Sequence, residues 1–175
     1  YELAVNQFTA MQSVEVADSS AVEQIYPYAL YYYSWSRYRL GEYEAALEGF
    51  STFVSEVPEH ELAARASYLG AWSAFRVNEH QEAARLLLGM QTYDVSDTPA
   101  VEAAFLLGRV YASLGQDDAA AAQFRLVYTD YPRSDYADDA WYEYSEAMVR
   151  LNRTDDAVAA LDALVHEYPA GNLTE

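Results

Sequence analysis

The sequence lacks cysteine and lysine, and it has no long apolar run. Without cysteine, disulfide bonds, thiolate metal ligands and Cys nucleophiles are all excluded. A helix needs about 18 consecutive apolar residues to cross a bilayer, and no stretch approaches that length. No segment has the basic-then-apolar order of a secretion signal. These absences leave the cellular compartment open.

Positive charge is also scarce. All 10 basic residues are arginines, and they stand against 28 acidic residues. The resulting net charge of −18 repels phosphate groups. We therefore expect neither nucleic acid nor an anionic membrane surface as a partner.

Residues that could carry chemistry are few and scattered. The histidines show neither zinc-ligand spacing nor a triad partner, and no Gly-rich phosphate loop is present. Paired carboxylates fall in the first turns of expected helices, where capping and the helix dipole explain them better than catalysis. These pairs are Asp117-Asp118, Asp138-Asp139 and Asp155-Asp156. We predict no enzyme activity, no metal and no cofactor for this chain.

What the sequence does contain is a repeat with a step of 37 residues. At each step a Gly or Asn ends a short motif, and these residue types accept the left-handed conformation that terminates a helix. The motifs are Leu40-Gly41, Val77-Asn78, Leu114-Gly115 and Leu151-Asn152. This pattern predicts four helix pairs, each joined by a tight turn.

Further rows with the same step predict where the helices of a pair cross. The second helices carry Ala46, Ala83, Ala120 and Ala157, followed one turn later by Phe50, Leu87, Phe124 and Leu161. The first helices carry the small residues Ser34, Ala71, Gly108 and Ser145. Helices approach closely where both present small side chains, so these rows should face one another. The slot that starts each second helix varies, which indicates a tolerant position: Tyr43, His80, Asp117 and Thr154.

Prolines and the chain ends set the expected boundaries. Three second helices are followed by proline, whereas Thr98-Pro99 starts the third pair as N-cap and first helical residue. The prolines are Pro58, Pro132 and Pro169. Residues 1–8 match residues 43–50 at Tyr, Glu, Ala and Phe, so residues 1–25 should be the second helix of a truncated repeat plus a connector. Four pairs then span about 26–61, 62–98, 99–135 and 136–172. We expect residues 26–175 to form one continuous solenoid and the chain to be a fragment of a longer one.

Small and apolar residues at these spacings resemble the tetratricopeptide repeat over nearly all of the chain after residue 26. The family's usual period is about 34 residues, and the extra residues here follow the proline. The resemblance implies an all-α, right-handed superhelical solenoid of antiparallel helix pairs. It also implies a non-catalytic protein–protein interaction scaffold that binds a protein or peptide segment on its concave face.

One linker resembles a branch of that family. Tyr131-Pro132-Arg133-Ser134-Asp135-Tyr136-Ala137, followed by Ala140 and Tyr142, is similar to linkers of Gram-negative envelope proteins. These are the outer-membrane assembly lipoproteins and the Tol–Pal-associated periplasmic protein. The resemblance implies a periplasmic location or an outer-membrane anchor on the periplasmic side.

In tetratricopeptide arrays the first helix of each pair lines the concave groove. Carried over by register, the partner-binding positions are Tyr28, Tyr31, Trp35, Tyr38, Arg39, Arg65, Tyr68, Trp72, Phe75, Arg76, Phe105, Arg109 and Tyr142. Aromatic and Arg side chains are enriched at binding hot spots. Trp35 and Trp72 give way to Arg109 and Glu146 in later pairs, which favours exposure of both tryptophans.

Other interpretations remain open for parts of this surface. The row Tyr31, Tyr68, Phe105 and Tyr142 is equally compatible with packing between helices. Arg39, Arg76 and Arg150 lie in last helical turns, where the helix dipole alone accounts for a cation. An aromatic small-molecule site would involve Tyr31, Trp35, Tyr68 and Trp72, but it shows no polar cluster.

Two alternatives concern the whole chain. It could be the helical accessory domain of an envelope enzyme or transport system whose active part lies outside this sequence. Terminal repeats would also expose apolar side chains such as Leu161, Leu164 and Val165, which could support a homodimer.

Overall fold

The computed structural model describes Tyr1, Asn6, residues 19–90 and residues 100–168. These residues form eight helices and no strand. The predicted leading helix, apart from Tyr1 and Asn6, and the predicted roles of Thr98-Pro99 and Pro169 lie outside the described residues.

The helices belong to two compact units. Unit 1, Tyr1–Thr98, contains α2 (Ser19–Leu40), α3 (Tyr43–Glu56), α4 (Ala63–Arg76) and α5 (His80–Gly89). Unit 2, Pro99–Glu175, contains α6 (Ala100–Ser113), α7 (Asp117–Asp130), α8 (Ala137–Arg150) and α9 (Thr154–Glu167). The break after Thr98 coincides with the expected boundary between the second and third pairs. A single continuous solenoid stays a prediction.

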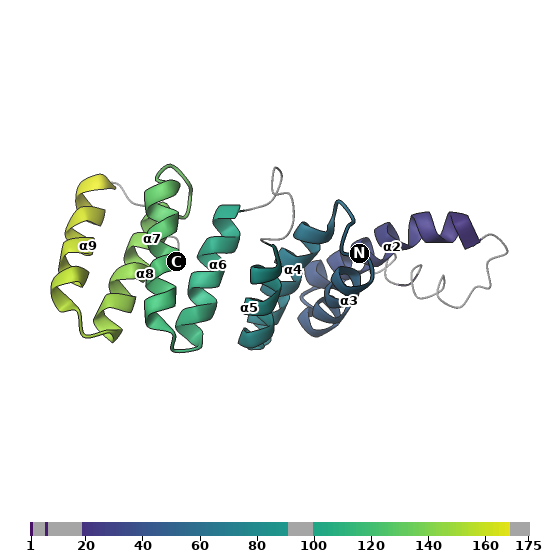
Figure 1. Cartoon of the computed structure of the whole chain (residues 1–175), viewed down its shortest axis with the longest axis horizontal. Coiled ribbons are helices and arrows are strands. Elements are labelled where there is room, and N and C mark those ends of the chain that lie inside the picture. Colours follow the sequence, from purple (N-terminus) through teal and green to yellow (C-terminus); the bar gives the residue numbers. More distant parts are fainter. Residues whose placement is uncertain (2–5, 7–18, 91–99, 169–175) are drawn as a thin grey trace. The chain divides into compact units, whose positions relative to one another are not determined.

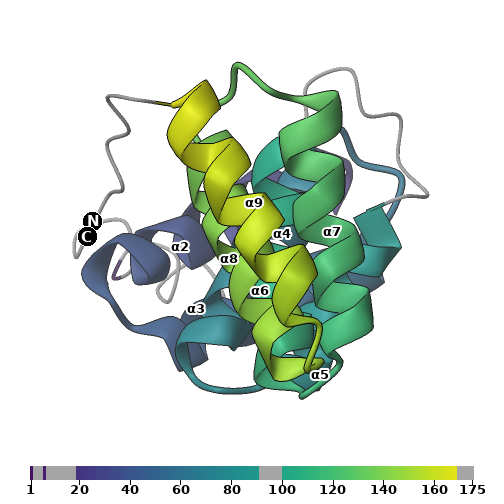
Figure 2. The same cartoon turned by 90° about the vertical axis from the view of Figure 1, so that its left-hand side faces the viewer.

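Each unit is built from neighbours in sequence. In unit 1, α3 packs against both α2 and α4, and α2 also contacts α4 (Figure 1). In unit 2, successive helices run in opposite directions, and α9 lies along α8 (Figure 2). First helices are therefore α2, α4, α6 and α8, and second helices are α3, α5, α7 and α9.

The four turns within the pairs close in the same way. Gly41, Asn78, Gly115 and Asn152 have φ values of 79°, 63°, 70° and 58°. The next residue of each turn donates its backbone N–H to the carbonyl five residues earlier. These donors are Glu42, Glu79, Gln116 and Arg153, at 3.0, 2.8, 2.9 and 2.9 Å. This Schellman pattern ends a helix and confirms the predicted turns.

The predicted crossing rows are buried at every position except Leu161. Their backbones come so close that some positions admit no side chain. A Cβ on Gly108 would lie 2.6 Å from Cε1 of Phe124, and one on Gly49 would lie 2.1 Å from Oγ of Ser34. Small residues therefore set the separation of the two helices in a pair.

The two units use the same register positions for their cores. Unit 1 buries Leu30, Tyr31, Ala46, Phe50, Phe53, Ala63 and Ala66. Unit 2 buries Phe105, Ala120, Phe124, Val127, Tyr128 and Ala140, and a second cluster holds Ala121, Ala147, Met148 and Ala157. Leu161 departs from its row, because it is 39% exposed while its equivalents are buried. Its helix, α9, has no following first helix among the described residues to cover that face.

Helix α2 begins earlier than expected. It starts at Ser19, so the last part of the predicted connector is helical and Pro27 lies inside the helix. Proline removes one backbone hydrogen bond and usually bends or breaks a helix. Pro27 is buried, and the helix beyond it packs on both α3 and α4, which offsets the lost bond.

The acidic pairs lie in first helical turns as predicted, but they do not cap in the expected way. The N-cap residues of α7, α8 and α9 are Gln116, Tyr136 and Arg153, and none forms a side-chain cap hydrogen bond. Asp138 accepts the backbone N–H of Asp139 at 3.0 Å. Asp117 instead accepts a hydrogen bond from Arg150. The carboxylates still interact favourably with the helix dipole, and the hydrogen bond to Asp138 is made within the first turn of its own helix.

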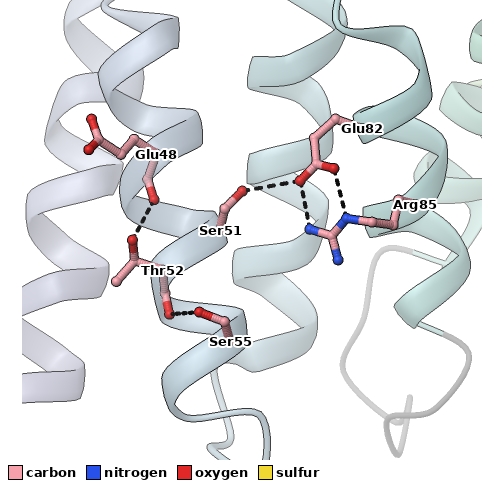
Figure 3. Close-up of polar contacts among 6 residues, drawn as sticks. All are labelled: Glu48, Ser51, Thr52, Ser55, Glu82 and Arg85. Carbon is pink, nitrogen blue, oxygen red and sulfur yellow. Dashed lines mark hydrogen bonds and ion pairs between the residues drawn. The ribbon is translucent and has the colours of Figure 1, made fainter.

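Neighbouring second helices of unit 1 are joined by a polar contact. Ser51 of α3 donates to Glu82 of α5 at 3.4 Å, and Arg85 forms a two-point contact with the same carboxylate (Figure 3). These hydrogen bonds lower the pKa of Glu82, with Arg85 as the main cause. The Thr52 and Ser55 hydroxyls bond backbone carbonyls within α3.

Replacing Gly108 by alanine should destabilise unit 2. The new methyl group would overlap the Phe124 ring, and overpacking a tight contact costs about 1–3 kcal/mol. Urea unfolding of the Gly108→Ala variant measures this loss. Gly89→Ala is the matched control, because no described atom lies within 4 Å of its Cβ position. Equal stability of the two variants would contradict the close crossing.

Candidate functional site

The first helices of unit 1 carry most of the predicted binding residues, and the structure sorts them by exposure. Tyr28, Arg39, Arg65 and Arg76 are exposed. Trp35, Tyr38, Tyr68, Trp72 and Phe75 are half-buried, so each keeps part of its ring accessible. Tyr31 is buried. We call the exposed and half-buried residues of this set, on α2 and α4, the aromatic–arginine face.

Tyr31 and Phe105 do not belong to a binding surface. They are 5% and 8% exposed, respectively. The Tyr31 ring contacts Phe50 and Phe53 edge-on, with centroids 5.8 and 5.9 Å away. Phe105 contacts Phe124 in the same way at 5.7 Å. Both side chains therefore lie in the core and not on the accessible face where the resemblance placed them.

The burial of these two rings follows from the place of their helix pair within each unit. In the first pair of a unit, the following pair covers this position. Ala66 of α4 and Ala140 of α8 belong to the same core clusters as Tyr31 and Phe105, respectively. The second pair of each unit differs, because Tyr68 is half-buried and Tyr142 is 44% exposed. An aromatic small-molecule site that includes Tyr31 is therefore not formed.

The two tryptophans are held by neighbouring groups. The indole N–H of Trp72 donates to the Tyr68 hydroxyl at 3.0 Å, and the ring meets Phe75 edge-on at 5.9 Å. Trp35 meets Tyr1 edge-on at 5.1 Å. Both rings are thus oriented before any partner arrives.

An arginine in the last turn of a first helix contacts the first residue of the second helix in the preceding pair. The guanidinium of Arg76 lies 4.6 Å from the ring centre of Tyr43. In unit 2 the corresponding contact is an ion pair, with Arg150 Nε 2.6 Å from Asp117 Oδ1. Arg39 lies 5.3 Å from the ring centre of Tyr1, which matches Tyr43 in the sequence.

The starting slot of the second helices is therefore not merely a tolerant position beside a turn. The repeat pattern predicted neither the contact of Tyr43 with Arg76 nor that of Asp117 with Arg150. The signal was present, because each arginine follows its partner by 33 residues. Only the folded chain shows that this separation brings the two side chains together.

Tyr28 marks the other end of the aromatic–arginine face. Its hydroxyl donates to Glu61 at 3.0 Å, and its ring meets His60 edge-on at 4.9 Å. The hydrogen bond to the Glu61 carboxylate raises the pKa of Tyr28. Tyr28 therefore has a fixed orientation on the surface while it remains 43% exposed.

In unit 2 the positions equivalent to Trp35 and Trp72 carry charged residues, Arg109 and Glu146. Glu143 is half-buried on α8, and sequence analysis did not single it out. Burial raises the pKa of this carboxyl, Arg109 and Arg150 oppose the rise, and Glu146 and Asp139 add to it. Arg109 is half-buried, and Tyr142 is exposed. Of these two predicted site residues, Arg109 interacts with the Glu143 carboxyl.

Among the described residues, no group of three or more His, Asp or Glu side chains is arranged to hold a metal ion. Within the same residues, no helix combines the length and apolar character needed to cross a membrane.

Comparison with known families returns one family description. Two models described as tetratricopeptide repeat match the chain, one over residues 68–135 and the other over residues 28–60 and 139–170. These stretches cover most of the chain. No curated protein sequence matches it significantly.

Solved structures match the fold at low sequence identity. A MamA protein matches with a TM-score of 0.72 and 19% identity, over 89% of this chain and 82% of that chain. A MamA fragment from Desulfovibrio magneticus RS-1 matches with a TM-score of 0.68 and 19% identity, over 83% of this chain and 77% of that chain. TPR-like repeats of a kinesin light chain described from Podosopora anserina match with a TM-score of 0.69 and 16% identity, over 95% of this chain and 84% of that chain. The predicted all-α fold of paired helices is confirmed.

Replacing Glu143 by glutamine should stabilise the protein at pH 7. A carboxyl whose pKa is raised on folding binds its proton more readily in the folded state, so its ionised form destabilises the fold above that pKa. The gain should shrink as the pH falls and vanish below about pH 4, where the glutamate is protonated in both states. Thermal unfolding of the wild type and the variant between about pH 3.5 and pH 8, a range that includes the titration of glutamate, measures this gain in stability.

Glu48→Gln is the control, since Glu48 is exposed on α3 and its replacement removes the same charge. Equal effects of the two substitutions at every pH would show that net charge, not the site of Glu143, is responsible.

Proposed function

Since the chain belongs to the tetratricopeptide repeat family, a protein-interaction fold, we propose that it is a non-catalytic scaffold that holds a segment of a partner protein against the aromatic–arginine face. The observation that carries this proposal is the partial exposure and fixed orientation of the Trp35 and Trp72 rings. Both rings are partly accessible and are oriented by neighbouring side chains.

Orientation before binding matters energetically. A partner that docks on mobile side chains must pay for ordering them, at about 0.5–1.5 kcal/mol for each one that is immobilised. Here the Tyr68–Trp72 hydrogen bond and the Tyr1–Trp35 contact have already restricted the rings. Large aromatic rings with a polar edge also bury much area in a small patch. Both effects favour a binding site on α2 and α4.

We also propose the bacterial envelope as the setting, either in the periplasm or anchored to the outer membrane on its periplasmic side. The support is the linker that begins at Tyr131-Pro132. Its backbone is closed by Ser134 N–H to Tyr131 O at 3.0 Å and by Ala137 N–H to Ser134 O at 3.2 Å. The linker that begins at Val57 closes with the same register, through His60 and Ala63.

Cell fractionation of the source organism, followed by immunodetection, tests the setting. The protein should appear in the periplasmic or outer-membrane fraction together with markers of those compartments. Recovery with cytosolic markers would refute an envelope location and would leave the scaffold proposal standing.

A pull-down from envelope extract tests the scaffold and its binding face. Trp35→Ala combined with Trp72→Ala should weaken capture of a bound protein by about 2 kcal/mol or more, which is roughly thirtyfold in Kd. Leu88→Ala with Leu126→Ala is the control, because these exposed leucines lie on second helices. Circular dichroism establishes that both double variants keep their helices.

The outcomes separate the alternatives. Capture by the wild type and the leucine variant, with loss in the tryptophan variant, supports both parts of the proposal. Equal capture by all three keeps the scaffold and rejects the aromatic–arginine face. No capture at all favours an accessory domain whose active partner domain lies elsewhere in a longer protein.

A further inference from the structure

The aromatic–arginine face of unit 1 repeats one arrangement of rings on two neighbouring first helices. Trp35 and Tyr38 of α2 have the same register as Trp72 and Phe75 of α4, one step of 37 residues later. All four rings are half-buried, and α2 contacts α4 directly. We call these two sets, Trp35 with Tyr38 and Trp72 with Phe75, the aromatic pairs.

Contacts through Tyr43 bring the two aromatic pairs close together. The Tyr43 ring meets Tyr38 of α2 edge-on at 5.8 Å, and the Arg76 guanidinium of α4 lies 4.6 Å from the centre of the same ring. Burial and Tyr43 raise the pKa of Tyr38, and the charge of Arg76 opposes that rise. The last turns of α2 and α4 therefore adjoin on this face.

The rings of both pairs are held in place before any partner arrives. Trp35 meets Tyr1 edge-on at 5.1 Å, and Trp72 donates to the Tyr68 hydroxyl at 3.0 Å. Trp72 also meets Phe75 edge-on at 5.9 Å. A rigid surface favours a ligand that is itself rigid, because little conformational freedom is then lost on either side.

A polyproline II helix is a rigid ligand whose dimensions match the two pairs. It has three residues per turn and rises about 3.1 Å per residue, so prolines three residues apart lie about 9 Å apart along one edge. The axes of packed α-helices are separated by about 8–10 Å. Equivalent positions of α2 and α4, such as Trp35 and Trp72, therefore repeat with nearly the same step as those prolines.

The polar groups beside the rings suit the backbone of such a segment. Carbonyl groups of a polyproline II helix form no internal hydrogen bonds and face the surroundings. Arg39 and Arg76 are exposed, and their guanidinium groups lie over the Trp35 and Tyr43 rings, respectively. A cation–π contact uses the charge of a guanidinium and leaves its N–H groups as donors. These groups can donate to backbone carbonyls of a partner that carries no charge.

The charges of the chain also favour a neutral segment. A net charge of −18 repels acidic segments at long range, and the arginines of this face repel basic ones at short range. Proline-rich segments need neither kind of charge, since they present apolar rings and carbonyl oxygens. Aromatic surfaces bind them through these two features.

We propose that the aromatic pairs of α2 and α4 bind a proline-rich segment of the partner protein in the polyproline II conformation. One proline packs on each pair, and the two prolines are three residues apart in the segment. The proposal rests on the scaffold function and specifies the class of its partner.

Fluorescence anisotropy with labelled synthetic peptides tests the site on the purified chain. One peptide has about nine prolines, roughly three turns of the helix. Two others of similar length place proline at every third or every fourth position, with serine between. The first two should bind. The peptide with the four-residue step should lose about tenfold in affinity, because its second proline misses the α4 pair. Equal binding of all three would overturn the matched spacing.

Single substitutions locate the binding site. Trp35→Ala and Trp72→Ala should each weaken binding of the all-proline peptide by about tenfold or more, the loss typical of a central aromatic residue. Tyr142→Ala is the matched control, because Tyr142 is an exposed aromatic residue on α8 of unit 2. It should bind as the wild type does. Equal losses in the three variants would overturn the site, and circular dichroism with unfolding curves excludes loss of structure as the cause.

Salt dependence on the wild type gives a test that needs no substitution. The affinity for the all-proline peptide should change by less than about twofold between roughly 0.05 and 0.5 M salt, since salt screens only interactions between charges. Steep weakening with salt would overturn docking through aromatic rings and would indicate ionic binding.

The envelope pull-down separates failure of this proposal from failure of the scaffold. Absence of binding to every proline peptide would reject the proline-rich partner. If the Trp35→Ala/Trp72→Ala variant still lost a captured protein, the scaffold would stand with another class of segment on its face. If the wild type captured nothing either, both proposals would be rejected.

Discussion

The structure depends on the close crossing of the two helices in each pair. At Gly108 and Gly49 the helices leave no room for a Cβ, and the alanine row at the crossing is almost fully buried. Such contacts stabilise only if the connecting turn reverses the chain in very few residues. Gly or Asn at positive φ provides that reversal in all four turns. The rest of each unit follows, because a closed pair presents one face to the next pair.

Contacts between neighbouring pairs divide the aromatic residues into two groups. Those covered by the following pair, such as Tyr31 and Phe105, become core. Those beyond the covered face, such as Trp35 and Trp72, stay partly accessible and are oriented by their neighbours. One sequence pattern therefore places aromatic rings both in the core and on the accessible face, and the neighbouring helices decide which of the two a given ring joins.

The distribution of arginine gives the two units different surfaces. In unit 2, Arg150 is paired with Asp117 and lies among carboxylates that include the half-buried Glu143. In unit 1, Arg39 and Arg76 stack on aromatic rings and keep their N–H groups available. The net charge of −18 repels polyanions at long range.

The sequence alone determined the helix pairs, the turns and the crossing rows, because these depend on local φ preferences and on the spacing of small residues. Helix α2 was an exception, since tertiary packing overrode the local signal of Pro27. Only the tertiary structure decided which groove aromatics are buried and which side chains meet across pairs. Tyr31 and Tyr68 occupy the same register, yet a following pair covers only the first within unit 1. Burial and charge pairing depend on neighbours distant in sequence, which a repeat pattern does not encode.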